Sequence, residues 1–190
     1  MTQQISVPCG IAVPQVFHDA PVDMGLVKKF VQEAESLGYH GLWVQERIIG
    51  ESPTLEALSL LSYVAALTDK ARLGTSVVVT TTHNPVHLAK QFSAIDQLSN
   101  GRLIVGIGLG GRPQHDQLLG GAPDRRVRYL VESLQVMKAL WEQPKARYQG
   151  HFWQLEGEEM EPKPVQKPSL PVWFGARHPD ALRRAVRYGD

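Results

Sequence analysis

The chain lacks the features that mark several classes of protein. It has a single cysteine, Cys9, in 190 residues, which excludes an internal disulfide. No run approaches the roughly 18 apolar residues of a membrane span, and the N-terminus MTQQISVPCG lacks the layout of a signal peptide. The 20 basic and 19 acidic residues nearly cancel, so there is no basic footprint for nucleic acid. These absences predict a cytoplasmic protein with neither a membrane nor a nucleic acid as partner.

The chain does have a repeated alternation of β-branched runs and amphipathic helical stripes. Hydrophobic residues make up 43% of it, enough to bury one substantial core. The predicted strands are residues 5–13, 41–45, 72–80, 103–107 and 170–176, and helices are predicted to start near Leu26, Ser52-Pro53, Asn84, Arg125 and Pro179. Cys9 is expected to be a small core residue of the first strand. Five strands alternating with helices predict a parallel sheet with right-handed crossovers.

The stretch 72–111, RLGTSVVVTTTHNPVHLAKQFSAIDQLSNGRLIVGIGLGG, carries the most information. It predicts a buried strand, a helix capped by Asn84 and started by Pro85, and a stop at Asn100-Gly101. A second buried strand then ends in glycines at positions 106, 108, 110 and 111, which let the backbone approach a ligand closely. The stretch therefore predicts a cofactor site at the ends of two neighbouring strands.

The alternation breaks between residues 142 and 169. Aromatic residues on either side of Gln149-Gly150 predict a small hairpin over 148–155, outside the main sheet. Residues 158–171 are charged and contain four prolines, which predicts an extended surface loop. We therefore expect one domain over residues 1–190 with a hairpin and loop insertion at 142–169.

The glycine stretch also matches the dinucleotide-binding pattern G-x-G-x-x-G through Gly106, Gly108 and Gly111. The context argues against a Rossmann unit, because a polar stretch over 112–123 delays the next helix to about Arg125. The unit is also fourth in order, whereas the fingerprint normally follows the first strand. A β/α barrel fits better, because its ligand sites collect at the carboxyl ends of its strands.

Four segments give the chain a resemblance to the bacterial luciferase-like flavin monooxygenase family, and more closely to its deazaflavin-dependent branch. They are LGYHGLWVQE, the stretch 72–111, EPKPVQKPSLPVWFGA and ALRRAVRYGD. The resemblance implies a TIM-barrel-like (β/α)8 fold that binds coenzyme F420, a 5-deazaflavin, or alternatively FMN. It also implies a homodimer and a small-molecule substrate. Because a full barrel typically needs about 250 residues, the chain is expected to cover about the first five βα units.

The resemblance also implies the cofactor site. The family places a non-proline cis peptide and a bulge beneath the central ring, and Ser76-Val77 match that pattern. Its phosphate contacts correspond to Gly108, Leu109 and Gly110 after strand four and to Gly175, Ala176 and Arg177 after strand five. Free N–H groups at the start of the last helix and the Arg177 guanidinium favour an anion. The alternatives are an ordinary trans strand and glycines needed only for tight turns.

Glu46 and Arg47 are the candidate catalytic residues. Many relatives carry an acidic residue followed by His beside the reactive ring, and here Arg47 replaces the imidazole. Arginine cannot exchange a proton near neutral pH, whereas histidine can. Arg47 is therefore expected to bind an anionic substrate or stabilise the reduced ring, unless it is a solvated or salt-bridged surface residue.

No metal site is predicted. His83 and His87 are spaced like a helical metal pair, but Asn84 and Pro85 place His83 before the helix. His115 and Asp116 are expected in the loop after strand four, where they either line the substrate entrance or belong to a solvated loop. Trp43 and Trp173 are expected on interior strands, as core or ring-packing residues.

The sequence thus predicts an oxidoreductase in which a bound deazaflavin or flavin exchanges a hydride with a small organic substrate. The close alternative is an FMN monooxygenase that activates oxygen in a water-poor pocket. A phosphate-binding barrel lyase or isomerase would use the same glycine loops. A chain with five strands is also compatible with a non-catalytic barrel fragment.

An open five-strand sheet leaves unpaired backbone edges at residues 5–13 and 170–176. We therefore expect the 190 residues, expressed alone, to aggregate or to be stable only in an assembly that covers both edges, and to bind cofactor poorly. Size-exclusion chromatography with light scattering, together with amide exchange, checks this expectation. A soluble monomer with strongly protected amides in both strands would contradict it.

Overall fold

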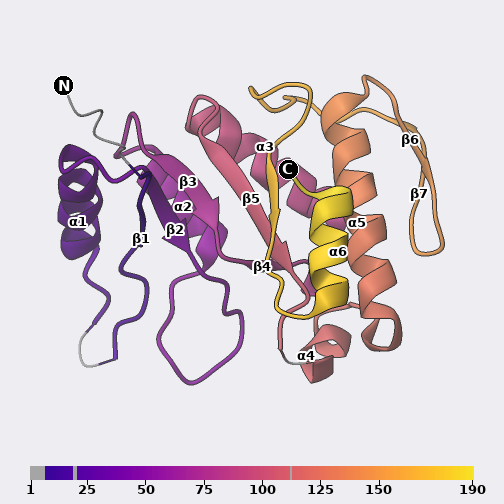
Figure 1. Cartoon of the computed structure of the whole chain (residues 1–190), viewed down its shortest axis with the longest axis horizontal. Helices are drawn as coiled ribbons and strands as arrows, with labels where there is room; N and C mark the ends of the chain where they lie inside the picture. Colours follow the sequence, from indigo (N-terminus) through magenta and orange to yellow (C-terminus); the bar gives the residue numbers. More distant parts are fainter. Residues whose placement is uncertain (1–6, 19–20, 112) are drawn as a thin grey trace.

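A parallel sheet lies at the centre of the computed structural model, which describes residues 7–18, 21–111 and 113–190. Its strands are β1 (Gly10–Ala12), β2 (Gly41–Val44), β3 (Arg72–Thr75), β4 (Val78–Val79), β5 (Leu103–Gly108) and β8 (Val172–Phe174). Their order is β1, β2, β3, β5, β8, and β4 pairs with β5 beyond the end of β3 (Figure 1). These pairings are all parallel, as predicted.

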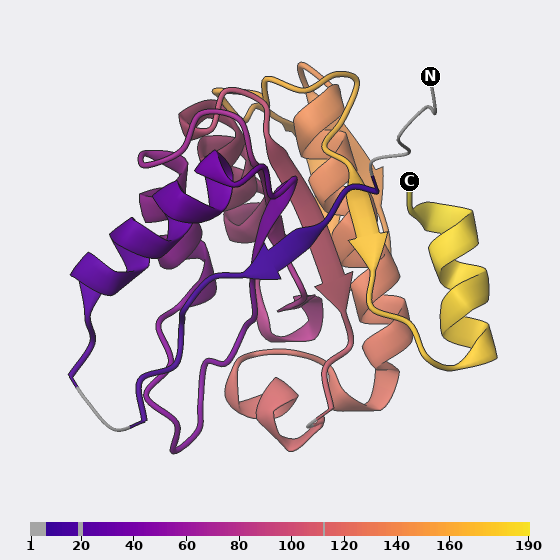
Figure 2. The same ribbon diagram turned by 60° about the vertical axis from the view of Figure 1, so that its left-hand side comes forward.

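Helices follow the strands. They are α1 (Met24–Ser36), α2 (Ala57–Ala65), α3 (Pro85–Leu98), α4 (Pro113–Leu118), α5 (Arg126–Glu142) and α6 (Pro179–Tyr188), with 3-10 turns at Thr80–Thr82 and Pro123–Arg125. The core between helices and sheet includes Leu42, Leu73, Leu88, Phe92, Leu103, Leu134 and Trp141. The strands run toward the end of the molecule where α4 lies (Figures 1 and 2). Within the described ranges, no helix is long and apolar enough to cross a membrane.

The predicted ends of α3 are confirmed. The Asn84 side chain accepts hydrogen bonds from the backbone N–H groups of Val86 (2.9 Å) and His87 (3.3 Å), and Pro85 is the first helical residue. After the helix, Asn100-Gly101 take positive φ angles of 52° and 81°, the left-handed conformation that ends helices.

The prediction that Ser52-Pro53 opens the second helix was wrong. Glu56 caps α2 instead, and its carboxylate accepts two backbone N–H groups of the first turn at 2.9 and 2.7 Å. The preceding residues are held in a loop by Gln15, whose side-chain amide donates to the Leu55 carbonyl at 2.7 Å. The Leu55 N–H donates to the Gln15 carbonyl at 3.0 Å. These contacts join residues 40 positions apart, which a local pattern does not reveal.

The stretch 112–123 was predicted as a loop, yet residues 113–118 form α4. His115 and Asp116 therefore lie on a short helix. Asp116 is fully buried and forms an ion pair with Arg126 at the start of α5. This ion pair stabilises α4, a polar segment that lacks an apolar stripe of its own.

The first strand is shorter than the predicted span 5–13. Residues 5 and 6 lie outside the described residues, and β1 begins at Gly10. Cys9 precedes the strand and is exposed, so its predicted core position was wrong. The reason is that β1 is an edge strand with one neighbour, β2, and little of it is covered.

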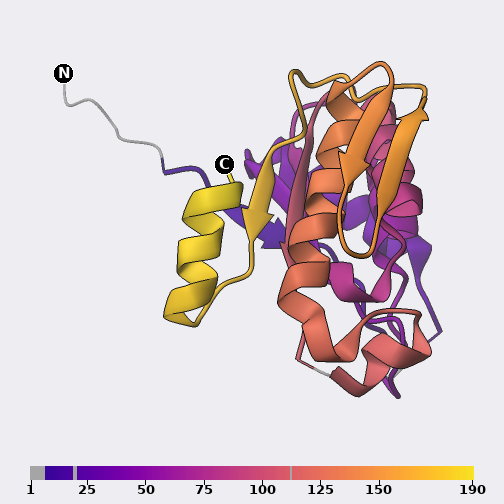
Figure 3. The same cartoon turned by 90° about the vertical axis from the view of Figure 1, so that its right-hand side faces the viewer.

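The predicted hairpin is confirmed as β6 (Ala146–Gln149) and β7 (Gln154–Glu158), an antiparallel pair that packs against α5 (Figure 3). The following residues, 159–171, have no regular secondary structure, as predicted. Hydrogen bonds nevertheless attach these residues to α3 and to the end of α5. Gln166 donates its backbone N–H (3.0 Å) and side-chain amide (2.8 Å) to the buried Asp96 of α3. Lys163 donates to two carbonyl groups at the end of α5.

Trp43 and Trp173 stack on each other, on the sheet face opposite the core residues Leu42 and Val44 of β2. Their ring centroids are 5.2 Å apart and their planes differ by 24°. A Cβ at Gly74 would lie 2.2 Å from the Trp43 ring, so a glycine on the neighbouring strand leaves room for the indole.

A polar network joins the amino-terminal ends of the strands. Arg102 donates to the carbonyl groups of Ala65 (3.0 Å), the last residue of α2, and of Thr68 (2.7 Å) and Ala71 (2.8 Å) in the loop before β3. Glu35 of α1 accepts N–H groups of the same loop, residues 69–71, at 2.8 to 3.1 Å. Burial alone would raise the pKa of Glu35, but these backbone hydrogen bonds and the nearby Arg102 hold that pKa below its ordinary value.

We predict that Glu35→Gln lowers the free energy of unfolding by about 1–3 kcal/mol at pH 7. Because the folded-state pKa of Glu35 is lowered, the carboxylate stabilises the fold above the unfolded pKa, and this is lost as pH falls through the folded pKa. Denaturant titrations between pH 3 and pH 7 should therefore show a shallower acid slope for the variant. Glu33→Gln, an exposed position on the same helix, is the control, and equal effects of both changes would contradict the prediction.

Candidate active site

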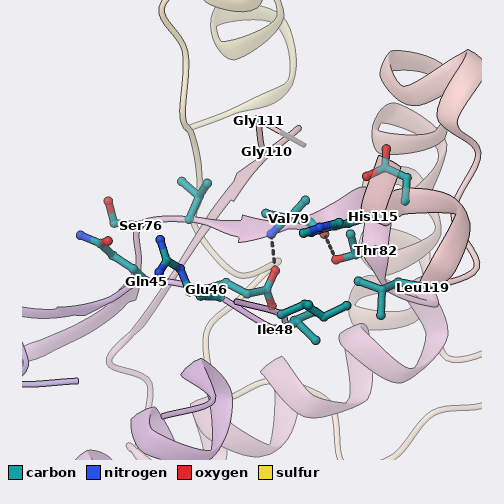
Figure 4. Close-up of a pocket in the computed structure, with 14 residues that line it drawn as sticks. Gln45, Glu46, Ile48, Ser76, Val79, Thr82, Gly110, Gly111, His115 and Leu119 are labelled. Carbon is teal, nitrogen blue, oxygen red and sulfur yellow. Dashed lines mark hydrogen bonds between the residues drawn. The ribbon is translucent and has the colours of Figure 1, made fainter. Parts of the chain in front are cut away.

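A cavity of about 400 Å³ opens at the carboxyl ends of β2, β3 and β5 (Figure 4). Its wall comes from the loop after β2, the break between β3 and β4, the glycine loop after β5, and α4. It includes Glu46, Arg47, Ser76, Val77, Gly110 and His115. The volume is within the range of small-molecule sites.

The break between β3 and β4 is built by Thr75 and Gly106. The Thr75 hydroxyl donates to the Gly106 carbonyl at 2.7 Å and accepts from the Gly106 N–H at 2.9 Å. A Cβ at Gly106 would lie 1.8 Å from the Thr75 carbonyl oxygen, so only glycine allows this approach. The next peptide, Ser76-Val77, is cis, as the family pattern predicts. The continuous strand predicted over 72–80 is therefore two short strands.

Three of the predicted cofactor-binding residues meet at this break. A Cβ at Gly108 would lie 2.8 Å from one γ-methyl of Val77, and a Cβ at Gly175 would lie 3.1 Å from the other. The Gly175 N–H donates to the Ile107 carbonyl at 2.9 Å, which fixes the end of β8 beside β5. Val77 therefore packs into space that both glycines leave free.

Arg126 binds the glycine loop after β5 through hydrogen bonds to its carbonyl groups. No motif in the sequence indicates this residue. Its guanidinium donates to the carbonyl of Leu109 and, at 3.4 Å, to that of Gly110. The same group bonds to Asp116 of α4. Gly110 has a φ of 65°, which favours glycine, and together with Gly111 it forms part of the cavity wall.

Glu46 lies in the wall, but its carboxylate is turned toward the protein. Its side chain is only 3% exposed. One oxygen accepts the backbone N–H of Val79 at 2.7 Å, and the other lies 2.7 Å from Nε2 of His83 (Figure 4 shows the first bond). The predicted acid is therefore present at the site, and the imidazole beside it comes from residue 83, a partner that sequence spacing does not reveal.

His83 also lies close to a second carboxylate, Glu56, the cap of α2. Burial alone would raise the pKa of Glu56, but hydrogen bonds from Ser59 and Leu58, together with the nearby His83, hold that pKa below its ordinary value. His83 itself is largely buried, and its carbonyl accepts the Tyr129 hydroxyl of α5 at 3.0 Å.

Arg47 is exposed and lines the cavity. Its guanidinium donates to the Ser52 hydroxyl at 2.7 Å and forms no ion pair within the described ranges. His115 of α4 lines the same cavity. The cavity therefore has an exposed arginine in its wall and two buried carboxylates, Glu46 and Asp116. Each has a partner, but Oδ1 of Asp116 has no hydrogen-bond partner among the described residues.

Of the predicted phosphate-binding residues, Gly110 lines this cavity, whereas Gly108, Leu109, Gly175, Ala176 and Arg177 are not among its lining residues. Leu109 precedes the cavity-lining glycines, and Ala176 and Arg177 connect β8 to α6. At the start of α6, Nδ1 of His178 accepts the Asp180 N–H at 3.3 Å, so one N–H is already used. Arg177 is exposed beside it.

The two histidines spaced like a metal pair are separated. His83 contacts Glu46, whereas His87 is exposed on α3. Across the described part of the chain, no group of three or more His, Cys, Asp or Glu side chains is arranged to hold a metal ion.

The fold and the cavity together define a class of protein: an α/β unit of the barrel type, with its ligand site at the carboxyl ends of parallel strands. More particularly, the chain belongs to the luciferase-like monooxygenase family, whose model matches residues 9–190. The resemblance predicted from the sequence is thereby confirmed.

Two curated relatives illustrate the range of the family. An F420-dependent glucose-6-phosphate dehydrogenase of Kineococcus radiotolerans is 30% identical over 175 residues, which is 87% of this chain and 51% of that protein. The oxygenase component of a flavin-dependent trigonelline monooxygenase of Acinetobacter baylyi is 32% identical over 170 residues, 83% of this chain and 44% of that protein. The chain spans about half the length of these relatives.

A solved structure supports the fold. An F420-dependent secondary alcohol dehydrogenase, in complex with an F420–acetone adduct, superposes with a TM-score of 0.80 at 21% identity. The match covers 96% of this chain and 56% of that one. The chain thus has the luciferase-like barrel fold and corresponds to about the first five βα units of it, as predicted.

Proposed function

We propose that this chain forms the cofactor-binding part of an oxidoreductase that moves a hydride between coenzyme F420 and a small organic substrate. The observation that carries the proposal is the cavity where the Ser76-Val77 break and the glycine loop after β5 meet. The F420-dependent dehydrogenases among the relatives support the choice of cofactor. We also propose that the enzyme is cytoplasmic and acts as a homodimer.

The residues of the cavity fit a flat ring with a phosphate-bearing tail. Ser76 and Val77 offer an edge of backbone and a small apolar side chain to the ring. Gly111 offers backbone that no side chain covers, because a Cβ there would meet nothing within 4 Å, whereas the methyl groups of Val79 lie against Gly110. When bound, the cofactor would supply the ring carbon that accepts or donates the hydride.

The protein would orient the cofactor and provide charge. Its tail phosphate is proposed to bind near Gly108, Leu109 and Gly110 and near Gly175, Ala176 and Arg177, where Arg177 adds positive charge. Glu46 would lie beside the ring, with its carboxylate held by its two hydrogen-bond partners. Arg47 would bind an anionic group of the substrate or stabilise negative charge on the reduced ring.

The second candidate function is an FMN-dependent monooxygenase. The flavin-dependent trigonelline monooxygenase among the relatives favours it. So do the apolar side chains of the wall, Ile48, Ile49, Val77, Val79 and Leu119, because oxygen activation needs a pocket with little water.

Titration of the purified protein with FMN and with coenzyme F420, followed by absorbance and fluorescence, tests the proposal. We expect tighter binding of F420. A preference for FMN would favour the monooxygenase. Absence of binding by either cofactor, in a protein that is folded by circular dichroism, would overturn both.

We predict that Gly108→Val weakens binding of the preferred cofactor at least tenfold, equivalent to about 1.4 kcal/mol. The added side chain would hinder the approach of the backbone to the phosphate and would also push against Val77. Fluorescence titration of the folded variant checks this prediction. An unchanged cofactor affinity would mean that Gly108 has only a structural role.

The double variant Val77→Ala/Gly108→Val separates the two causes. If the approach to the ligand is what matters, removing the γ-methyl groups of Val77 leaves binding weak. Recovery of wild-type affinity would assign the loss to packing against Val77 instead.

A further inference from the structure

His83 is not a lining residue of the cavity, but its imidazole contacts one that is, Glu46. Its Nε2 is 2.7 Å from Oε1 of Glu46, while Oε2 of Glu46 accepts the N–H of Val79 at 2.7 Å. Val79 is the second residue after the Ser76-Val77 peptide, which lines the cavity. A short chain of contacts therefore runs from His83 through Glu46 to the segment proposed to support the ring.

This chain of contacts is well shielded and anchored. The side chains of Glu46 and His83 are 3% and 19% exposed. The backbone of His83 is fixed at both its polar groups, because its N–H donates to the Thr80 carbonyl at 3.3 Å and its carbonyl accepts the Tyr129 hydroxyl at 3.0 Å. A buried carboxylate oxygen without a partner is disfavoured, so loss of the imidazole would favour another orientation of the Glu46 side chain.

We propose that His83 is a positioning residue of the cofactor cavity. Its imidazole holds the Glu46 carboxylate in the orientation that binds the Val79 N–H, and so fixes Ser76-Val77 where the ring rests. His83 acts through Glu46, because only Glu46 of the two lines the cavity. The role rests on the proposed function in that it requires a ligand above Ser76-Val77.

The first test needs no cofactor. Amide hydrogen exchange, read by NMR, should be at least tenfold faster at Val79 in His83→Leu than in the wild type. His83→Gln, which keeps an N–H donor, should restore most of the protection. His87→Leu is the matched control, because His87 is exposed on α3. Unchanged Val79 exchange in folded His83→Leu overturns the proposal.

The second test measures the affinity for whichever of FMN and coenzyme F420 the wild type binds. His83→Leu should weaken binding at least tenfold, His83→Gln by less than threefold, and His87→Leu not at all. In a Glu46→Gln background, His83→Leu should have little further effect, because the link is already broken. Matched thermal midpoints exclude a general loss of stability.

The two tests separate failure of this role from failure of the proposed function. Faster Val79 exchange with unchanged cofactor affinity overturns the role of His83 toward the ligand and leaves the cofactor proposal intact. A wild type that binds neither cofactor overturns the proposed function and this role with it. If His83→Gln and His83→Leu weakened cofactor binding equally, an N–H donor at position 83 would not be what supports the site. That result would also overturn the proposal.

Discussion

The close approach of β3 and β5 at Thr75 and Gly106 is the constraint on which the site depends. Because Gly106 has no side chain, the Thr75 carbonyl can lie where a Cβ would be, and the Thr75 hydroxyl takes over both polar groups of Gly106. The chain then leaves the regular pairing at Ser76-Val77 and rejoins β5 as β4. This displacement makes a ledge at the carboxyl end of the sheet, and the cavity opens beside it.

The charges around the ledge are arranged so that the buried carboxylates have partners. Glu46 is held by Val79 and His83, and Oδ2 of Asp116 by Arg126, while Oδ1 of Asp116 is buried without a hydrogen-bond partner among the described residues. Buried polar groups are stabilised by hydrogen bonds of this kind, and here the bonds join separate segments of the chain. The exposed Arg47, which lines the cavity, donates to a neutral partner, the Ser52 hydroxyl.

Long-range polar contacts of the same kind shape the rest of the fold. Gln15 holds the segment before α2, Arg102 and Glu35 hold the loop before β3, and Asp96 holds the loop after the hairpin. In each case a side chain satisfies backbone groups of a segment with no regular structure. Irregular segments can therefore be buried in part without leaving N–H or carbonyl groups unpaired.

The sequence by itself determined the order and type of the main elements, because helix periodicity, β-branched runs and caps such as Asn84-Pro85 act over a few residues. It also located the carboxyl-end site and, through its family pattern, the cis peptide at Ser76-Val77. Only the tertiary structure decided the start of α2, the helical state of residues 113–118, the exposure of Cys9 and the pairing of His83 with Glu46. The first, second and fourth of these depend on contacts with residues that are distant in the sequence. The exposure of Cys9 depends on the absence of a covering neighbour at the sheet edge. No local sequence pattern contains that information.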